Sequence, residues 1–189
     1  MPAPLFRDSF EAYRTRQLEG ALTKVEKLSE RDLTSPAVQG VLEKTANAAG
    51  FEVAVLHPDE KSGSPRTERR TDGGHTASVE VEVMDITIPF TGSPESFTVA
   101  PSQNTHIDIP VAVHQDALVA TLVRDDYLEG RLATFICRTS QNLDQMRKDV
   151  GALRAGVRNA IAEAAYRHAE RLKSQREPYK IRTFPIRGD

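Results

Sequence analysis

The stretch Leu143–Ala164, LDQMRKDVGALRAGVRNAIAEA, is the most informative about the fold. Its apolar side chains recur at alternating spacings of three and four residues, the pattern of a coiled-coil seam about three heptads long. The spacing runs through Leu143, Met146, Val150, Leu153, Val157, Ala160 and Ala164, with Ile161 at the edge of the seam. We expect these side chains to be buried, either against the rest of the chain or in a homo-oligomer.

The helix that carries this seam should be long. No proline occurs between Arg124 and Pro178, so a helix is predicted over 126–176. Thr139-Ser140-Gln141-Asn142 suggests a break near 139–142, because short polar side chains compete for backbone hydrogen bonds. An extended basic tail is expected over 177–189.

Upstream, residues 1–125 read as an α+β body. Helices are predicted over 9–29, with a capping box at Asp8 and Glu11, and over 35–50. Residues 58–74 contain no large apolar side chain and are predicted to be a mobile loop. Alternating segments then predict a mainly antiparallel sheet of four or five strands, with a hairpin across 114–116 and a β-bulge near 83–85.

Composition narrows the class of protein. No apolar run reaches the roughly 20 residues that span a bilayer, and the N-terminus lacks the layout of a signal peptide. The single cysteine excludes an internal disulfide. A cytoplasmic protein with no membrane segment and no cofactor is therefore expected.

Charge is unevenly distributed along the chain. Residues 124–189 contain 14 Lys and Arg against 9 Asp and Glu, whereas the whole chain has a net charge of −2. A basic helix could contact phosphates of a nucleic acid without reading its sequence. The candidate residues are Arg147, Lys148, Arg154, Arg158, Arg167 and Arg171. Charges flanking a helical seam are the alternative explanation.

Candidate catalytic or metal-binding residues are few. His106 and Asp108 could supply two ligands of a metal site that other residues complete, although a polar sheet face is the favoured explanation. Cys137 lies in an apolar helical run, where cysteine usually behaves as a small buried side chain. His168 lies on the extension of the seam and could form a pH-sensitive contact, although a seam-edge residue with no special role is the favoured explanation. We therefore assign no catalytic residue and no metal site.

Three segments of the sequence resemble those of a group of bacterial proteins. Pro89–Phe97 with Pro101-Ser102, and Asn142–Val150, are similar to segments of uncharacterised bacterial proteins, as is Arg171-Leu172 through Ile186-Arg187. In longer members this N-terminal module precedes a restriction-endonuclease-like nuclease domain, which implies a role in defence against foreign DNA. No catalytic residue of that family maps onto this sequence, so its activity does not carry over.

Three hypotheses follow from the sequence. The first is a non-catalytic binding or assembly module that works with a protein partner or a second copy, as a partner subunit of a bacterial nucleic-acid-directed defence or restriction system. The second is a nucleic-acid-binding protein that acts through the basic helix. The third is an enzyme with an unrecognised site near His106 and Asp108.

Overall fold

The structure, a computed structural model, describes residues 5–71 and 78–180. The chain divides into two compact units. The sheet unit comprises Met1–Tyr13 and Phe51–Gly151, and the helical unit comprises Arg14–Gly50 and Ala152–Asp189. Helices α1 (Phe10–Glu26) and α4 (Leu128–Lys180) each contribute residues to both units. Within the described ranges, no helix has both the length and the apolar composition required to cross a bilayer.

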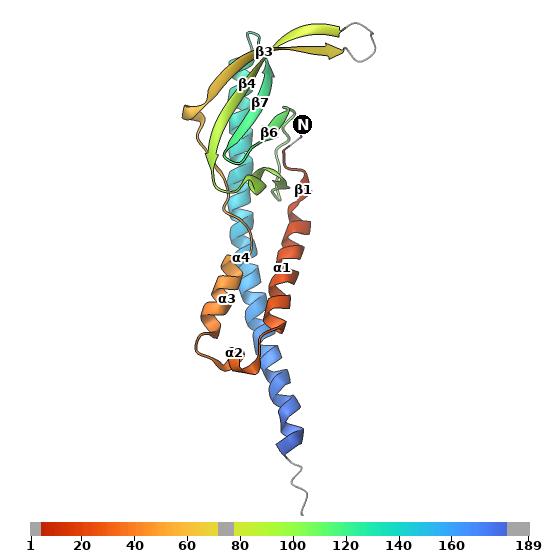
Figure 1. The fold of residues 1–189 in the computed structure, drawn as a ribbon, viewed down its shortest axis with the longest axis vertical. Helices are drawn as coiled ribbons and strands as arrows, with labels where there is room; N and C mark the ends of the chain where they lie inside the picture. The colour runs from red at the N-terminus through yellow and green to blue at the C-terminus, as the bar shows by residue number, and fades with distance from the viewer. Residues whose placement is uncertain (1–4, 72–77, 181–189) are drawn as a thin grey trace, which may run out of the picture. The chain divides into compact units, whose positions relative to one another are not determined.

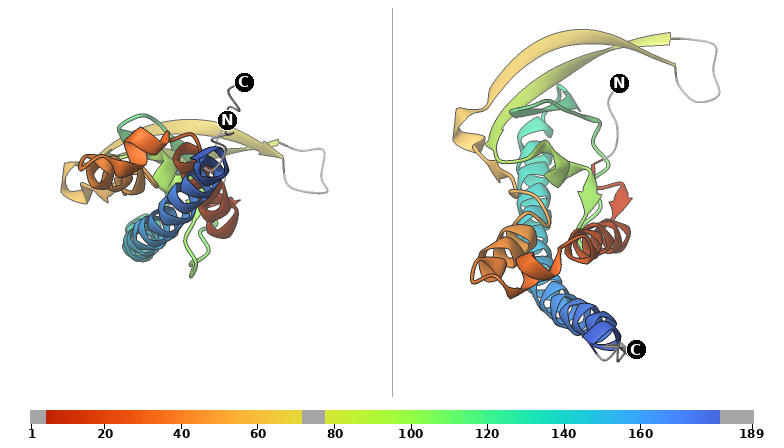
Figure 2. Two further views of the ribbon diagram at one scale, coloured as in Figure 1. Left: turned by 90° about the horizontal axis from the view of Figure 1, so that it is seen from below. Right: turned by 60° about the horizontal axis from the view of Figure 1, so that its bottom comes forward.

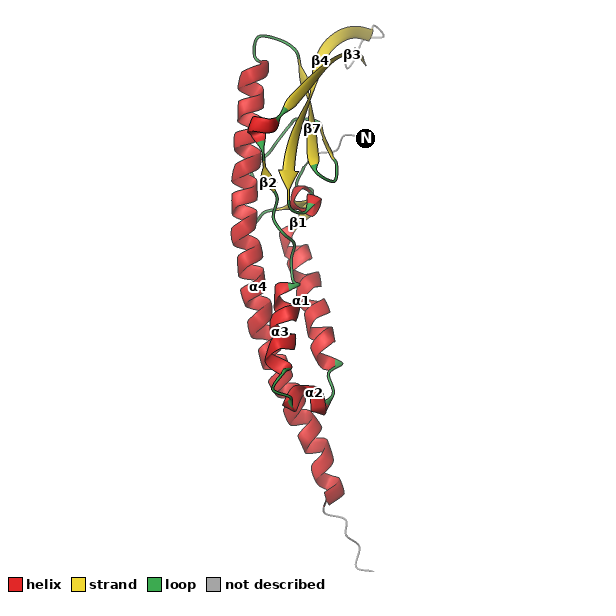
Figure 3. Ribbon diagram, turned by 60° about the vertical axis from the view of Figure 1, so that its left-hand side comes forward, coloured by secondary structure: helices red, strands yellow, loops and turns green. Residues whose placement is uncertain are grey.

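The helical unit contains three helices before Phe51, rather than the two expected. Helices α2 (Glu30–Thr34) and α3 (Val38–Asn47) follow α1, and all three lie beside the second half of α4 (Figures 1 and 3). Ser29 and Asp32 form a capping box at the start of α2. Asp8 belongs to a strand, because its backbone pairs with Val99.

The sheet unit contains a five-stranded antiparallel sheet and a separate pair of parallel strands. The main sheet has the order β2-β4-β7-β6, with β3 also paired to β4. Its strands are β2 (Val55–Leu56), β3 (Ser62–Thr71), β4 (Ser78–Thr91), β6 (Val111–Val113) and β7 (Ala117–Val123). The parallel pair is β1 (Asp8–Ser9) with β5 (Val99–Ala100), and the short 3-10 helices are η1 (Pro58–Glu60) and η2 (Pro94–Phe97).

The loop predicted over 58–74 is wrong for most of its length, because Ser62–Thr71 forms β3. This strand pairs with β4 from Ser62 opposite Thr87 to Thr71 opposite Ser78, and the two strands continue past the part of β4 that β7 pairs (Figure 2). Residues 61–67 are all exposed, so the strand needs no apolar side chains and resembles a loop in composition. Residues 72–77 lie outside the described part of the chain.

The β-bulge predicted near 83–85 is also wrong. The register of β4 against both β3 and β7 is continuous through Val83, Met84 and Asp85. The apolar pattern changes phase because Val79 and Val83 lie on the opposite face of the strand from Ile86. Val79 is 56% exposed, so its β-branched side chain reflects strand preference rather than a core position.

The core of the sheet unit lies between the sheet and the first half of α4 (Figure 3). Its buried members are Leu5, Phe6, Ala54, Ile86, Ile88, Phe90, Phe97, Ile107, Val111, Leu118, Ala120, Leu122, Phe135 and Leu143. The helix is not broken at 139–142, because Thr139 donates its hydroxyl to the Phe135 carbonyl and remains within the helix. It also continues past residue 176 to Lys180, and the rest of the expected tail lies outside the described residues.

Candidate binding surfaces around the first half of the long helix

Polar side chains on one side of α4 hold the segment 102–106, which we call the strap. Asn142, only 1% exposed, forms two hydrogen bonds with the backbone of Thr105. The Thr105 N–H donates to Asn142 Oδ1 at 2.8 Å, and Asn142 Nδ2 donates to the Thr105 carbonyl at 2.9 Å. Asp149 accepts from the Ser102 N–H at 2.7 Å and from its hydroxyl at 2.8 Å. Arg138 donates to the His106 carbonyl at 3.2 Å.

The turn before η2 is held in a similar way. Gly92 has φ +94°, and a Cβ there would lie 3.0 Å from the Cα of Ala54. Ser96 is fully buried and accepts the Ala54 N–H at 2.9 Å, while Arg147 donates to the Ala54 carbonyl at 2.8 Å. Gly92 and Ser96 belong to the Pro89–Phe97 segment of the resemblance, and Asn142, Arg147 and Asp149 belong to the Asn142–Val150 segment. Their roles in this structure are structural.

The six basic residues predicted to contact nucleic acid all lie on α4, and several of them form polar contacts within the chain. Arg147 also pairs with Asp144, and Arg154 donates to the Ala49 carbonyl at 3.1 Å. Arg167 pairs with Glu163 at 3.5 Å, and Arg171 lies 3.0 Å from Nδ1 of His168. Lys148, in the sheet unit, and Arg158, in the helical unit, are exposed. Four of the six are therefore engaged within the chain.

The predicted seam is buried within a single chain. Its members Leu143, Met146, Val150, Leu153, Val157 and Ile161 are 0–3% exposed. In the helical unit, Val25 of α1 and Ala46 of α3 are buried as well. The seam consequently offers no free surface to a second copy of the chain.

His106 Nε2 contacts a carboxylate oxygen of Asp108, and the two side chains are 78% and 81% exposed. Their segment is irregular, and the β6–β7 hairpin that follows begins only at Val111, so strand pairing does not bring them beside Glu80 or Glu82. In residues 5–71 and 78–180, no three His, Cys, Asp or Glu side chains are grouped as metal ligands would be.

The expectation of a buried cysteine is wrong, because Cys137 is exposed. It falls on the solvent side of α4, whereas Phe135 of the same apolar run is buried in the core. His168 is buried, with Nε2 3.0 Å from the Leu28 carbonyl. This nitrogen must carry the proton, because a carbonyl can only accept, and Nδ1 therefore accepts from Arg171.

A cavity of about 520 Å³ lies between the segment after the strap and the first turns of α4, and we call it the strap groove. Its apolar lining includes Ile107, Ile109 and the buried Phe135, and its charged residues are Asp108, Asp126, Arg131 and Arg138. Tyr127 also lines the groove and is 75% exposed.

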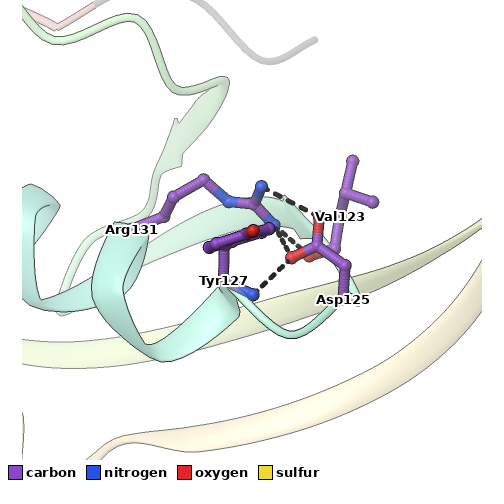
Figure 4. A network of polar contacts seen from close by, with 4 residues as sticks. All are labelled: Val123, Asp125, Tyr127 and Arg131. Atoms are coloured by element: carbon purple, nitrogen blue, oxygen red, sulfur yellow. Dashed lines mark hydrogen bonds and ion pairs between the residues drawn. The ribbon is translucent and has the colours of Figure 1, made fainter.

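Arg131 is held in place at the edge of this groove (Figure 4). Its guanidinium donates to both carboxylate oxygens of Asp125, at 2.6 and 3.0 Å, and to the Val123 carbonyl at 2.7 Å. The Tyr127 N–H donates to the same carboxylate at 2.9 Å. Hydrogen bonding from Arg131, and then from the Tyr127 backbone, lowers the pKa of Asp125 below its usual value. The Asp125 carboxylate therefore fixes both the Arg131 side chain and the backbone at the start of α4.

A second cavity, of about 610 Å³, lies between the β3–β4 hairpin and α4, and we call it the edge groove. Gly63 of β3, with Met84 and Ile86 of β4, forms one wall. The other wall comes from α4 and includes Leu128, Leu132, Ala133 and Ile136. Lys61 and Glu129 supply the charged residues of this groove.

The other face of the sheet carries a polar network. Arg66 donates to Asp85 at 2.5 Å, and Thr121 donates to the same carboxylate at 2.6 Å. The Arg66 hydrogen bond lowers the pKa of Asp85, and the same bond raises the pKa of Arg66. Every resolved pKa shift in the described chain likewise favours the charged form: lower for the acids Asp32, Asp85 and Asp125, and higher for the bases Arg66 and Lys173. Such shifts are typical of structural ion pairs.

Comparison of the sequence with models of protein families, with curated proteins and with solved structures found no match.

Proposed function

We propose that this protein is a binding module without a catalytic centre of its own, and that it holds a protein partner in the strap groove. The observation that carries the proposal is Tyr127, which is 75% exposed beside an apolar floor and a fixed arginine. Tyrosine and arginine around an apolar centre are the residue types that contribute most to protein–protein affinity.

The polar chemistry of the described chain supports binding over catalysis. The polar residues that drew attention in the sequence mostly hold backbone segments in place, as Asn142, Arg147 and Asp149 do. General acid–base catalysis needs a group whose pKa lies near the working pH. The pKa values of Asp85 and Asp125 are instead lowered, further from neutral pH.

The partner that we propose is a subunit of a bacterial nucleic-acid-directed defence or restriction system. This part of the proposal rests on the resemblance of the Pro89–Phe97 and Asn142–Val150 motifs to a module that precedes nuclease domains. A module of this kind would position a separate catalytic subunit rather than cut nucleic acid itself.

The test is affinity purification from the native host, followed by affinity measurement on the recombinant partner. The variant is Tyr127→Ala, and the matched control is Tyr166→Ala, because Tyr166 is 70% exposed elsewhere on α4. Loss of a central tyrosine contact of about 2 kcal/mol weakens binding by about 30-fold. Equal affinity of wild type and Tyr127→Ala would remove the strap groove as the site.

The absence of catalysis is tested separately. We expect the purified protein to hydrolyse no nuclease, phosphatase or esterase substrate when divalent metals are supplied. Turnover that disappears when His106→Ala is combined with Asp108→Ala would overturn this part of the proposal. Turnover that persists in the double variant would identify a contaminating enzyme.

A further inference from the structure

Strand β3 has a free edge. It pairs residue for residue with β4, and in the described part of the chain that is its only partner strand. The opposite edge therefore presents backbone N–H and C=O groups over a strand of ten residues. Such an edge is a template for pairing with another chain.

Pro65 indicates which backbone groups point outward. Proline cannot donate to a ladder, so it is tolerated where the nitrogen faces away from the neighbouring strand. Pro65 lies opposite Met84 in an unbroken register, so its nitrogen should face the free edge. With a period of two, the backbone groups of Gly63 and Thr67 face the same way.

Gly63 and Pro65 belong to the face of the sheet that α4 covers. Gly63 is opposite Ile86 and Pro65 is opposite Met84, and both β4 side chains line the edge groove. The free edge and the apolar groove are therefore adjacent. A strand added beside β3 would direct every second side chain toward α4 and into the groove.

We propose that the edge groove binds an extended segment of a different protein, which adds to β3 as a further strand. Backbone hydrogen bonds to Gly63 and Thr67 would supply much of the affinity. Apolar side chains at every second position would fill the space beside Leu132 and Ile136. This inference does not depend on the strap groove, whose lining residues are entirely different.

The composition of β3 identifies the occupant. A second copy pairing through β3 would offer SGSPRTERRT, which contains no large apolar side chain to fill the groove. The complementary segment carries apolar side chains at alternate positions, which β3 itself does not. The occupant is therefore a different protein.

The experiment uses a random library of twelve-residue peptides displayed on phage and selected on the full chain. Selected peptides are synthesised, and their affinities are measured by fluorescence polarisation. The edge variant is Thr67→Pro, which removes one outward N–H, and its control is Thr67→Val, which keeps it. The groove variant is Ala133→Glu, and its control is Ala152→Glu, another exposed alanine of α4.

We expect selected peptides that alternate apolar and polar residues and that lose affinity at least about tenfold on Thr67→Pro and on Ala133→Glu. Thr67→Val, Ala152→Glu and Tyr127→Ala should bind as wild type does. Failure to select any peptide, or equal binding to Thr67→Pro and wild type, would overturn the proposal. Loss of binding only in Tyr127→Ala would assign the peptides to the strap groove instead.

Far-UV circular dichroism shows whether the Thr67→Pro variant remains folded. Thr67→Pro should retain the wild-type spectrum, because a proline with its nitrogen at the free edge removes no bond to β4. Unfolding of Thr67→Pro alongside a folded Thr67→Val would place the Thr67 N–H in the β4 ladder and refute the orientation on which the proposal rests.

Discussion

The contact between Asn142 and the strap makes a quantitative prediction. Asn142→Ala removes both hydrogen bonds to Thr105 and leaves a half-buried N–H and C=O without that partner. Each hydrogen bond contributes about 1 kcal/mol, and poorly solvated groups left unpaired add to the loss. We expect the free energy of unfolding to fall by about 2–3 kcal/mol.

Urea denaturation followed by circular dichroism measures this change. With a slope of about 2 kcal/mol per molar urea, the midpoint should fall by about 1–1.5 M. Hydrogen exchange at the Thr105 amide should accelerate as well, because that amide loses its acceptor. The matched control is Gln141→Ala, an exposed neighbour that should change stability by less than about 0.5 kcal/mol.

Asn142→Asp adds a pH dependence to the same test. A carboxylate there would accept the Thr105 N–H but face the Thr105 carbonyl, so the folded state should raise the pKa of the new carboxyl. Its stabilising hydrogen bond should be complete below the ordinary value of about 3.9 and lost as pH rises through the raised pKa. If Asn142→Ala lowers the free energy of unfolding by less than about 0.5 kcal/mol, the contact between Asn142 and Thr105 does not stabilise the fold as we infer.

Four further predictions follow. The hydrogen bonds from Arg66 and Thr121 hold the pKa of Asp85 below its ordinary value of about 3.9. The stability that Asp85 contributes should therefore be present above that value and lost as pH falls through the folded pKa. Urea titrations should show that the free energy of unfolding depends less on acid pH in Asp85→Asn than in wild type. Gly92→Ala should lower stability by about 1–3 kcal/mol, because Gly92 has a positive φ and close neighbours. Gly156→Ala should raise stability by about 0.5–1 kcal/mol, because Gly156 lies on α4 with open space around it. Thermal melting measures both changes. Val157→Asp should unfold the helical unit, seen as lost ellipticity, because it buries an unpaired charge at a site 1% exposed; a folded variant with an altered light-scattering mass would instead make the seam an oligomer interface. Duplex DNA should not bind measurably at about 50 mM salt, and binding with a salt slope that Arg158→Ala reduces by about 0.9 would restore the nucleic-acid hypothesis.

Local periodicity in the sequence was sufficient to predict several features of the fold. The alternating spacing of Leu143, Val150 and Val157 predicted one buried face of a long helix, and these residues are 1–2% exposed. The hairpin across 114–116 followed from two alternating runs around a polar turn, and it forms as β6 and β7. Such patterns are written in neighbouring residues, because helices and strands repeat every few positions.

The tertiary structure alone decided what those faces meet. Strand β3 has no apolar alternation, and only its pairing with β4 makes it a strand. The predicted break at Thr139–Asn142 is absent because Thr139 bonds within the helix and Asn142 binds Thr105, 37 residues away. The burial of the seam within the chain depends on the same kind of long-range packing. A local sequence pattern predicts that a face of a helix or strand is buried, but it does not specify which distant segment packs against that face.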